Sequence, residues 1–440
     1  MTAIAVLGAQ WGDEGKGKVS HLLSQEADFC VRFNGGTNAG HRVIFTKMKV
    51  STAERRGGAV TEEGEFKFHL VPSGALHEHC TGVLGNGMMI DPSALITEIE
   101  MLKSIKNEDP KFFISSRAHL LLPYHQMVEE LAGAARELAT TSKGIGPAYG
   151  DKIQRRGITM ADLLFAEEFR GKLKRNLERE KQFWGGHSSL AKLNADALAD
   201  EIIKLFEAAA LPLRERIVDT VKLLNQALDE GKKVIFEGAQ GCLLDVDFGT
   251  YPYVTSSSAT IGGIGIGAGV SPRRIERVIG VMKAYTTRVG SGPFPTEARD
   301  ASGERLQLKG QEFGTTTGRP RRCGWLDLVA LKYAARINGF TEWTLMKLDV
   351  LSAFEEIPVA ISYQYQGECL EDFPMAPSIL ERCEPVYKKL PGWQEDISHC
   401  REFSELPLNA QRYIRFIEEQ LEIPISLISV GPASTDTIFK

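Results

Sequence analysis

The sequence of 440 residues has no run of about 18 consecutive apolar residues, so no segment is expected to span a membrane. The segment Ala3-Ile-Ala-Val-Leu7 has the length of a strand, without a basic flank or a small-residue cleavage site, which argues against a secretory signal. A formal net charge of −5 gives no general attraction to nucleic acid or membrane. We therefore expect a cytoplasmic protein with no nucleic-acid or membrane partner, in which any anion site is local.

Cysteine is scarce: seven residues, at positions 30, 80, 242, 323, 369, 383 and 400, form no Cys-x-x-Cys pair. A scattered, odd set argues against both a disulfide framework and a thiolate zinc site, and we expect reduced, mostly buried thiols. The run His77-Glu-His-Cys80 resembles a metal cluster only superficially, because adjacent side chains on a strand or turn diverge. We interpret it as structural.

Short β-branched segments alternate with helical patterns along the chain. Six segments are predicted as buried strands: Ile4 to Leu7, Phe29 to Phe33, Val234 to Phe236, Val278 to Met282, Thr344 to Leu348 and Pro424 to Val430. Five have helical patterns: Pro92 to Ile105, Tyr124 to Leu138, Arg214 to Glu230, Leu326 to Ile337 and Asn409 to Leu421. The alternation predicts one large α/β domain over residues 1–440, around a mostly parallel central sheet with helices on both faces.

The composition changes in three regions. Residues 47–66 are highly polar and are expected to form an exposed hairpin or loop, and we interpret the stretch of about 47–64 as an insertion. Residues 161–211 are charged and helical and predict an accessory helical region. Residues 249–271 and 286–324 are rich in Gly, Ser, Thr, Pro and Arg. Loops of this length inside a compact domain are usually functional or disordered.

The first strand runs into a glycine-rich loop that differs from a standard phosphate-binding loop. Gln10 and Gly17 stand where the usual pattern has a glycine and a Ser or Thr. The glycines still let the backbone approach a ligand, and the first amides of the following helix, together with Lys16, favour an anion. The loop therefore predicts a phosphate site, although a plain strand-to-helix turn is the simpler alternative.

Two acids, Asp13 and Glu14, stand in this loop. A carboxylate about 4 Å from a phosphate oxygen would cost on the order of 4 kcal/mol at an effective dielectric constant near 20. The cost is tolerable if a cation lies between them or if the acid accepts a proton. Asp13 is thus a candidate Mg²⁺ ligand, a general base, or both. No role follows for Glu14.

Other polar clusters follow predicted strands or fill the long loops. Asn34, Asn38 and His41 follow the second strand, at the edge where α/β sheets bind ligands, although a lone histidine is more often structural. Three arginines within residues 319–322 form either a solvated basic face or a carboxylate or phosphate site. Asp349, after another strand, could accept from N1–H and the 2-amino group of guanine, or be an ordinary strand-end residue. The glycine-rich run 262–269 does not match a dinucleotide fingerprint.

Together these motifs resemble the adenylosuccinate synthetase family. The matching segments run in family order over nearly the whole chain: Gln10-Trp-Gly-Asp-Glu-Gly-Lys-Gly-Lys18, Asn38-Ala-Gly-His41, Lys143-Gly-Ile-Gly-Pro-Ala-Tyr149, Phe236-Glu-Gly-Ala-Gln-Gly241, Gly249-Thr-Tyr-Pro-Tyr-Val-Thr-Ser-Ser257, Thr286-Thr-Arg-Val-Gly-Ser-Gly-Pro-Phe-Pro-Thr-Glu297, Thr316-Thr-Gly318, Gly324-Trp-Leu-Asp327 and Lys347-Leu-Asp-Val350.

The resemblance implies GTP-dependent ligation of IMP and L-aspartate to adenylosuccinate, with release of GDP and phosphate, on the route from IMP to AMP. It implies a 6-phosphoryl-IMP intermediate, Mg²⁺ as cofactor, one ion per subunit, and a homodimer in which Arg155 reaches the neighbouring active site. By this resemblance Asp13 removes the N1 proton of IMP, and His41 donates a hydrogen bond to the leaving β-phosphate. Positioning and charge neutralisation would supply most of the catalysis.

The resemblance also assigns site residues. The catalytic set is Asp13, Lys16, His41 and Gln240, and the Mg²⁺ ligands are Asp13 and Gly40. The GTP set is Gly12, Asp13, Glu14, Gly15, Lys16, Gly17, Lys18, Gly40, His41, Arg42, Arg321, Lys347, Leu348, Asp349, Ser429, Val430 and Gly431. The IMP set is Asp13, Glu14, Gly15, Lys16, Asn38, Ala39, Gly40, His41, Thr141, Arg155, Gln240, Thr255 and Arg319. The L-aspartate set is Thr315, Thr316, Thr317, Gly318, Arg319, Pro320 and Arg321.

The chain departs from the family pattern at Ser142-Lys143, at Pro320 and at Arg42. Lysine keeps the charge of arginine but loses its bidentate geometry, so the affinity for L-aspartate or IMP could differ. Two other functions stay open from the residues: a different phosphoryl-transfer enzyme on a related fold, and a non-catalytic nucleotide-binding regulator. The first leaves the Thr/Arg loop unexplained, and the second leaves Asp13, Lys16 and His41 unexplained.

Overall fold

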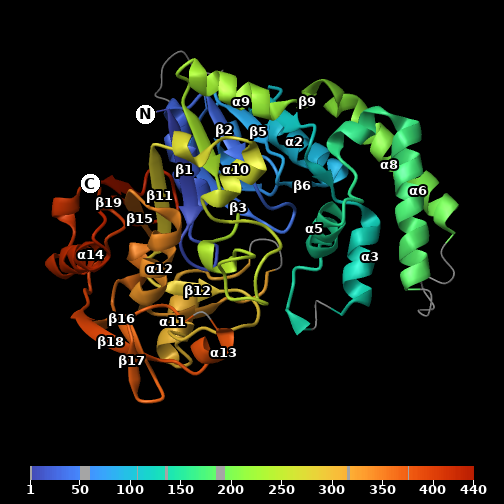
Figure 1. Cartoon of the computed structure of the whole chain (residues 1–440). Helices are drawn as coiled ribbons and strands as arrows, with labels where there is room; N and C mark the ends of the chain where they lie inside the picture. Colours follow the sequence, from blue (N-terminus) through green and yellow to red (C-terminus); the bar gives the residue numbers. More distant parts are fainter. Residues whose placement is uncertain are drawn as a thin grey trace, which may run out of the picture.

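The computed structural model describes residues 2–49, 60–106, 108–133, 137–184, 194–314, 318–374 and 376–440, with the backbone alone for 46–49 and 60–63. Ten strands form one sheet (Figure 1). Their order is β20 (Thr437–Phe439), β19 (Ile425–Ser429), β15 (Glu342–Met346), β11 (Arg277–Lys283), β1 (Ala3–Gly8), β10 (Val234–Glu237), β2 (Phe29–Arg32), β5 (Thr81–Leu84), β7 (Phe112–Ser115) and β9 (Ile217–Val218). Neighbouring strands are parallel except β19 and β20, which confirms the predicted α/β class.

The two faces of the sheet follow from the alternation of side chains along each strand. In β1, Ala5 and Leu7 belong to the largest core cluster, whereas Ile4 and Val6 belong to a separate cluster on the other face. Helix α1 (Lys16–Leu23) contributes Val19 to the second cluster. Because both faces are covered, β1 is apolar at every position, as expected for a central parallel strand.

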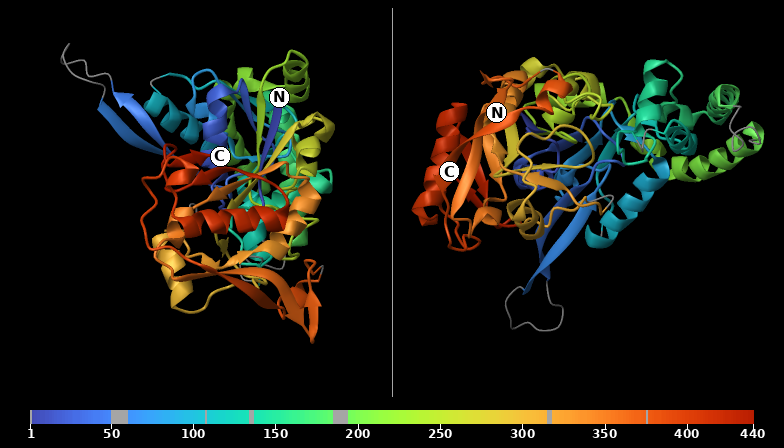
Figure 2. Two further views of the ribbon diagram at one scale, coloured as in Figure 1. Left: turned by 90° about the vertical axis from the view of Figure 1, so that its left-hand side faces the viewer. Right: turned by 90° about the horizontal axis from the view of Figure 1, so that it is seen from below.

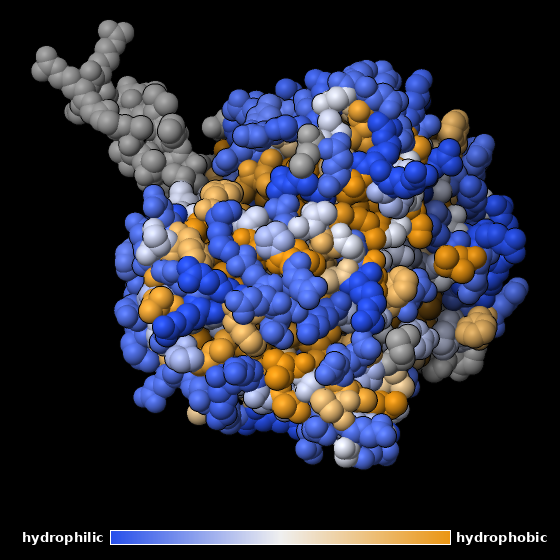
Figure 3. Space-filling view, turned by 60° about the vertical axis from the view of Figure 1, so that its left-hand side comes forward, coloured by the Kyte–Doolittle hydropathy of each residue, from blue (hydrophilic) through white to orange (hydrophobic). Residues whose placement is uncertain are grey.

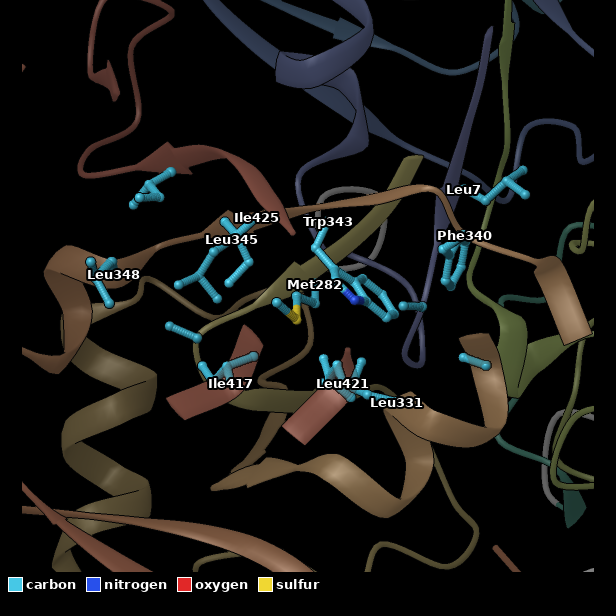
Figure 4. Close-up of a cluster of buried hydrophobic side chains, with 14 of the residues drawn as sticks. Leu7, Met282, Leu331, Phe340, Trp343, Leu345, Leu348, Ile417, Leu421 and Ile425 are labelled. Carbon is cyan, nitrogen blue, oxygen red and sulfur yellow. The ribbon is translucent and has the colours of Figure 1, made fainter. Parts of the chain in front are cut away.

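The largest core cluster is built from strands and helices distant in sequence. Helices α9 (Thr220–Asp229), α10 (Gly262–Ala268), α12 (Leu328–Asn338) and α14 (Leu408–Leu421) contribute to it. Figure 4 shows part of it, where Trp343 of β15 and Met282 of β11 lie near Leu331 of α12 and Ile417 of α14. This packing fixes the strands whose carboxyl ends line the cavity described below.

Most of the predicted elements are present, with shifted ends. The six predicted strands correspond to β1, β2, β10, β11, β15 and β19, and Pro92 to Ile105 lies in α2 (Pro92–Lys106). The helix predicted for 214–230 is wrong over its first part, where Arg214–Arg216 is a 3₁₀ turn and Ile217–Val218 is the edge strand β9. The helix predicted for 326–337 begins only at Leu328, because Leu326–Asp327 is the short strand β14. Helix α3 (Pro123–Leu131) ends earlier than predicted.

The predicted accessory helical region is a pair of long helices beside the sheet (Figure 1). Helices α6 (Ala166–Phe183) and α8 (Ala195–Leu213) pack through apolar side chains, with the rings of Phe169 and Phe206 in an edge-on contact at 6.2 Å. They share a core cluster with α2 and with β5 and β7. That these helices belong to the single domain predicted for residues 1–440 stays a prediction.

The remaining elements lie outside the ten-stranded sheet. They are β6 (Met89–Ile90), β8 (His119–Leu120), α5 (Ile145–Ile153), β12 (Thr286–Arg288), α11 (Ala301–Lys309), β13 (Arg322–Gly324), β16 (Glu356–Tyr365), β17 (Glu368–Leu370), α13 (Pro377–Leu380) and β18 (Glu384–Pro391). Short 3₁₀ turns lie at Ser24–Glu26, Ser73–Leu76, Met160–Leu164, Cys242–Leu244, Pro272–Arg274, Leu348–Leu351 and Phe403–Glu405.

The polar stretch belongs to an antiparallel hairpin of β3 (His41–Lys49) and β4 (Val60–Phe68), which projects from the body of the protein (Figure 2). The prediction of a hairpin is confirmed by this pairing, and residues 50–59 lie outside the described residues. On the face drawn in Figure 3 hydrophilic side chains predominate, with hydrophobic ones scattered between them. None of the helices in the described ranges is long and apolar enough to cross a membrane.

All seven cysteines are free and six are buried, so the prediction of reduced, mostly buried thiols is confirmed. The imidazoles of His77 and His79 bond the backbone carbonyls of His21 and Ser24 at 2.9 and 3.2 Å, which confirms their structural role. Among the described residues no group of three or more His, Cys, Asp or Glu side chains is arranged to hold a metal ion.

Candidate active site

A cavity of about 800 Å³ opens at the carboxyl ends of the parallel strands. The loops that follow β1, β2, β10, β15 and β19 all contribute to its wall, as expected for a ligand site on an open α/β sheet. Most of the predicted site residues line this one cavity: Gly12, Asp13, Glu14, Gly15, Lys16, Gly17, Lys18, Asn38, Ala39, Gly40, His41, Arg42, Thr141, Gln240, Thr255, Arg319, Arg321, Lys347, Asp349, Ser429 and Gly431.

The loop between β1 and α1 forms the middle of the cavity wall. Gly12, Asp13 and Gly15 adopt positive φ angles of 82°, 59° and 100°, so the chain turns tightly before the helix begins at Lys16. A Cβ on Gly12 would lie 3.6 Å from Gln240 Cα, and one on Gly15 would lie 3.0 Å from Met346 Cε. The loop therefore lies between the Gln240 end of the cavity and the Met346 end.

Glu14 lies beneath this loop with a fully buried side chain. Its Oε1 accepts hydrogen bonds from the amides of Gln10 at 3.0 Å and Gly12 at 2.9 Å, and Oε2 accepts from Lys16 Nζ at 2.5 Å. A Cβ on Gly241 would lie 2.4 Å from Glu14 Oε1, so glycine there leaves the space that the carboxylate fills. The second acid of the motif thus organises the loop from within and fixes the cation at the start of α1.

Asp13 faces the cavity and is about a quarter exposed, at 27%. Its Oδ2 lies 2.9 Å from Nε of Arg321, which comes from the distant arginine-rich loop. The phosphate loop and the predicted L-aspartate loop are therefore in contact through one ion pair. Because the partner of Asp13 is an arginine side chain, the carboxylate can exchange this partner for a metal ion.

His41 is held from behind by a buried carboxylate. Its Nδ1 lies 2.5 Å from Oε1 of Glu237, whose oxygens also accept from Arg32 NH1 at 3.2 Å and from the Ser73 amide at 2.9 Å. Burial raises the pKa of Glu237, but His41 and Arg32 outweigh it and lower that pKa to about 2. Burial, followed by Arg32, lowers the pKa of His41 to about 4. A neutral His41 beside an ionised Glu237 carries its proton on Nδ1, which leaves Nε2 for a ligand.

At the Gln240 end, polar atoms lack partners among the described residues. Asn38 Oδ1 and Gln240 Nε2 are buried and unbonded within that part of the chain, and both residues line the cavity. Asn34 fixes the segment of Gln240 by accepting from the Ala239 amide at 2.8 Å and donating to the Ala239 carbonyl at 3.3 Å. Buried polar atoms of this kind normally have partners, so they mark places for ligand donors and acceptors.

At the Met346 end, Lys347 and Asp349 follow β15. Lys347 has a φ of 60° and donates to the Gly310 carbonyl at 2.7 Å. Asp349 Oδ1 is buried without a partner in the described part of the chain, and burial raises the pKa of this carboxyl. Lys18 ties the end of β19 to α1, because its Nζ donates to Ser429 Oγ at 2.8 Å and to the Gly431 carbonyl at 3.0 Å. Burial lowers the pKa of Lys18 to about 7.

Some predicted residues do not line the cavity. The side chains of Leu348 and Val430 are buried in the core, which leaves only their backbone for a ligand. Gly318 and Pro320 lie beside the cavity wall without lining it, and Arg155 is exposed outside it with a φ of 62°. Thr315, Thr316 and Thr317 lie outside the described residues.

Sequence reasoning missed the buried carboxylates Glu237 and Glu312 and the buried Arg32. Glu237 is the last residue of an otherwise apolar strand, and that position was the available signal. The local sequence did not indicate that Glu14 pairs with Lys16, because the space for the Glu14 side chain is left by Gly8 and by the distant Gly241.

The parallel sheet, the glycine-rich loop before α1 and the polar cavity at the carboxyl edge define a nucleotide-dependent α/β enzyme. The family model of adenylosuccinate synthetase matches residues 5–438. Two curated relatives, both adenylosuccinate synthetases, are those of Moorella thermoacetica, at 49% identity, and Thermodesulfovibrio yellowstonii, at 46%. In each case the match covers 100% of this chain and 99% of the relative.

A solved structure, that of fully ligated adenylosuccinate synthetase from Plasmodium falciparum, superimposes with a TM-score of 0.91 at 40% identity and covers 100% of both chains. The chain therefore belongs to the adenylosuccinate synthetase family.

Replacing Glu14 should destabilise the protein more than replacing an exposed ion-pair partner. In Glu14→Ala the Lys16 ammonium would stay buried without its partner, and two amides would lose an acceptor, so we expect a loss of about 3 to 5 kcal/mol in the free energy of unfolding. The measurement is the urea unfolding midpoint. Glu65→Ala, which removes an exposed pair with Arg42, is the control and should cost about 1 kcal/mol or less. Equal effects of the two changes would contradict the role of Glu14.

Proposed function

We propose that this chain joins IMP and L-aspartate to form adenylosuccinate, with GTP converted to GDP and phosphate. Its membership of the adenylosuccinate synthetase family over residues 5–438 carries this proposal. The geometry supports the proposal, because the loop of Asp13 lies between two polar ends of a single cavity. The volume of the cavity, about 800 Å³, is large enough for two nucleotides. The product is a precursor in purine nucleotide synthesis, and we infer that the reaction takes place in the cytoplasm.

The proposed reaction has two steps. In the first, Asp13 takes the N1 proton of IMP while O6 attacks the γ-phosphorus of GTP, so that the bond to the β-phosphate oxygen breaks and 6-phosphoryl-IMP forms with GDP. In the second, the neutral amine of L-aspartate attacks C6 and forms the C6–N bond, the C6–O6 bond breaks so that O6 leaves as part of phosphate, and the nitrogen releases one proton. Phosphorylation turns a poor leaving oxygen into a good one, and catalysis rests on positioning and on neutralised charge.

Several observations support the roles of individual residues in the first step. Asp13 is partly exposed and faces the cavity from a fixed left-handed backbone. Glu14 holds Lys16 at the start of α1, where an anion is favoured. Glu237 orients His41 so that Nε2 is left for the β-phosphate, to which it donates once an anion favours its protonated form. Gln240 Nε2, which has no partner within the described ranges, is placed to meet the purine of IMP.

The residues fit a Mg²⁺ ion. Asp13 and the carbonyl of Gly40 both line the cavity, and carboxylate and carbonyl oxygens are the ligands that Mg²⁺ prefers. Mg²⁺ commonly takes one or two protein ligands and completes its shell with phosphate and water, so a larger acidic cluster is not needed. When bound, the ion would neutralise charge on the transferred phosphoryl group.

We assign the three substrates to parts of the cavity. Asn38, Thr141, Gln240, Thr255 and Arg319 would hold IMP, together with the loop residues Asp13, Glu14, Gly15, Lys16, Ala39, Gly40 and His41. L-Aspartate would lie under the loop of residues 315–321. GTP would bind along residues 12–18 and 40–42, with Arg321 beside it and its base against Lys347, Asp349 and the backbone of 429–431. Asp349 Oδ1, buried without a partner in the described chain, supports the last assignment because guanine offers two N–H donors.

We infer that the working form is a homodimer in which Arg155 completes the IMP site of the partner subunit. Arg155 is exposed and outside its own cavity, at the end of α5. Its position is fixed by Arg156, whose Nε donates to Asp151 Oδ1 at 2.5 Å and whose amide donates to the Asp151 carbonyl at 2.9 Å. A rigid turn that presents an arginine outward is suited to reach another molecule.

The function is tested by assaying adenylosuccinate formation while IMP, L-aspartate, GTP and Mg²⁺ are omitted one at a time. The proposal predicts that product and phosphate appear only when all four are present. Phosphate release with IMP alone at the full rate would indicate a different phosphoryl-transfer enzyme. A purified protein that binds GTP and IMP without turnover would indicate a regulator.

Asp13→Asn should lower kcat at least about a thousandfold, because the amide neither accepts the N1 proton nor neutralises Mg²⁺ as a carboxylate does. Asparagine keeps the size of aspartate and tolerates the left-handed backbone, so the fold should be preserved. Steady-state kinetics measure the effect, and calorimetry should still detect GTP binding. A rate near that of the unchanged protein would refute the role of Asp13 as base.

Asp349→Asn should weaken GTP and favour xanthosine triphosphate. The amide can donate to the xanthine O2, whereas the carboxylate accepts from the guanine amino group, so we expect KM for GTP to rise about tenfold or more. The measurement is the ratio of kcat/KM for the two nucleotides. Asp372→Asn, at an exposed ion pair with Arg336, is the matched control and should leave the ratio unchanged. An unchanged preference in Asp349→Asn would show that this residue does not contact the base.

Arg155→Leu should be nearly inactive alone and should recover when mixed with Asp13→Asn subunits. Each mixed dimer has one site with both Asp13 and Arg155 intact, so random exchange of equal amounts should give about one quarter of the full activity. Activity is followed against mixing ratio after subunit exchange. A mixture no more active than its two components would exclude a shared site.

A further inference from the structure

Glu312 is a fully buried carboxylate that receives four side-chain donors. Its Oε1 accepts from Lys283 Nζ at 3.1 Å, from Lys347 Nζ at 2.7 Å and from the hydroxyl of Tyr285. Its Oε2 accepts from Arg321 NH1 at 2.5 Å. Three of these donors are cationic, so Glu312 is the centre of a buried charge cluster.

The cluster has a net positive charge, because one carboxylate is surrounded by three cations. Burial raises the pKa of Glu312, but Lys283, Lys347 and Arg321 outweigh it, so the net pKa lies far below the usual range and the group is ionised. Burial lowers the pKa of Lys283 to about 8, with Glu312 opposing that change. One carboxylate thus keeps three cations close together where, without it, they would repel one another.

The three cations come from different segments. Lys283 ends β11, and Lys347 follows β15 in a left-handed conformation. Arg321 closes a loop that leaves the body at Glu312 and returns to it, because the Arg321 amide donates to the Glu312 carbonyl at 2.9 Å and Phe313 pairs with Pro320. Glu312 therefore stands where the described ends of this loop, Phe313–Gly314 and Gly318–Pro320, join the body of the protein.

Two of the three cations, Arg321 and Lys347, connect Glu312 to different parts of the cavity wall. Arg321 continues from Glu312 to Asp13, with Nε 2.9 Å from Oδ2. Lys347 precedes Asp349 by two residues, and its ammonium also bonds the Gly310 carbonyl at 2.7 Å. Arg321, Lys347 and Asp349 line the cavity, whereas Glu312 lies behind them. No other carboxylate among the described residues has salt bridges to both Arg321 and Lys347.

We propose that Glu312 is a positioning residue that couples the L-aspartate loop to the guanine end of the GTP site, by holding Arg321 and Lys347 with one carboxylate. The inference rests on the proposed function, since it takes the assignments of Arg321 and Lys347 from it. Glu312 also gives Arg321 a second anchor. Arg321 can therefore stay at the cavity wall when Asp13 gives up its ion pair to bind Mg²⁺.

The test is Glu312→Gln, which keeps the shape of the side chain and loses its charge. Since charge-assisted hydrogen bonds to both cations are lost, KM for L-aspartate and KM for GTP should each rise about tenfold or more. KM for IMP should change by about threefold or less, because within the described part of the chain Asn38, Thr141 and Gln240 make no hydrogen bond or ion pair with Glu312, Arg321 or Lys347. Calorimetry with GTP alone should show the same weakening without any turnover.

A matched control is Glu342→Gln, at a largely buried carboxylate that pairs with Arg277 at 2.7 and 3.0 Å and does not line the cavity. It should leave all three KM values unchanged. A double variant separates the effect of Glu312 through Arg321 from its effect through Lys347. In an Arg321→Gln background, Glu312→Gln should add little to KM for L-aspartate, yet should still weaken GTP through Lys347.

The outcomes are distinct. If the unchanged protein does not form adenylosuccinate, the proposed function fails, whatever Glu312 does. If it does form the product, and Glu312→Gln lowers kcat alone or raises all three KM values alike, then Glu312 is merely structural and the inference is overturned. Selective loss of L-aspartate and GTP supports it.

Discussion

The cavity depends on one constraint: the buried carboxylates of Glu14, Glu237 and Glu312 must be matched by donors, and most of these donors are basic side chains that line the cavity. Glu14 pairs with Lys16, Glu237 with His41 and Arg32, and Glu312 with Arg321 and Lys347. An unpaired buried charge would cost several kcal/mol, so each pairing fixes a geometry strongly. The cations that would contact phosphate and L-aspartate are thus held before any ligand arrives, which lowers the cost of ordering them on binding.

The parallel sheet supplies the framework for these pairs. Because neighbouring strands run in one direction, their following loops meet at one edge, and residues more than 190 positions apart, such as His41 and Glu237, come into contact. Both faces are covered by helices, so the strands are held from two sides and their ends are well defined. The loop of residues 12–15 can therefore hold a left-handed Asp13 between the Gln240 and Met346 segments.

Much of the fold could be predicted from the sequence because the signal is local. The six central strands are short apolar segments, and periodicity identified most helices. The errors came where tertiary pairing outweighed local pattern. Ile217–Val218 is an edge strand because it pairs with β7, although the surrounding segment has a helical pattern. The start of α12 gave way to β14 for the same reason, because Leu326 and Asp327 pair with β16.

For the site, the residues that line the cavity were easier to identify from the sequence than the buried residues that hold them in place. Asp13, Lys16, Asn38, His41, Gln240 and Asp349 stand in glycine-rich or strand-end motifs, which local pattern reveals. Glu237 ends an apolar strand and Glu312 stands in a short polar loop segment, and the importance of both appears only when distant cations converge on them. Glu14 belongs to both groups. Its place in the loop was evident from the sequence, but its buried position beside Lys16 depends on the space left by Gly8 and Gly241. A carboxylate in a phosphate loop is thus explained by where its side chain lies, since Asp13 faces the cavity while Glu14 lies beneath the loop and neutralises the lysine that the loop presents.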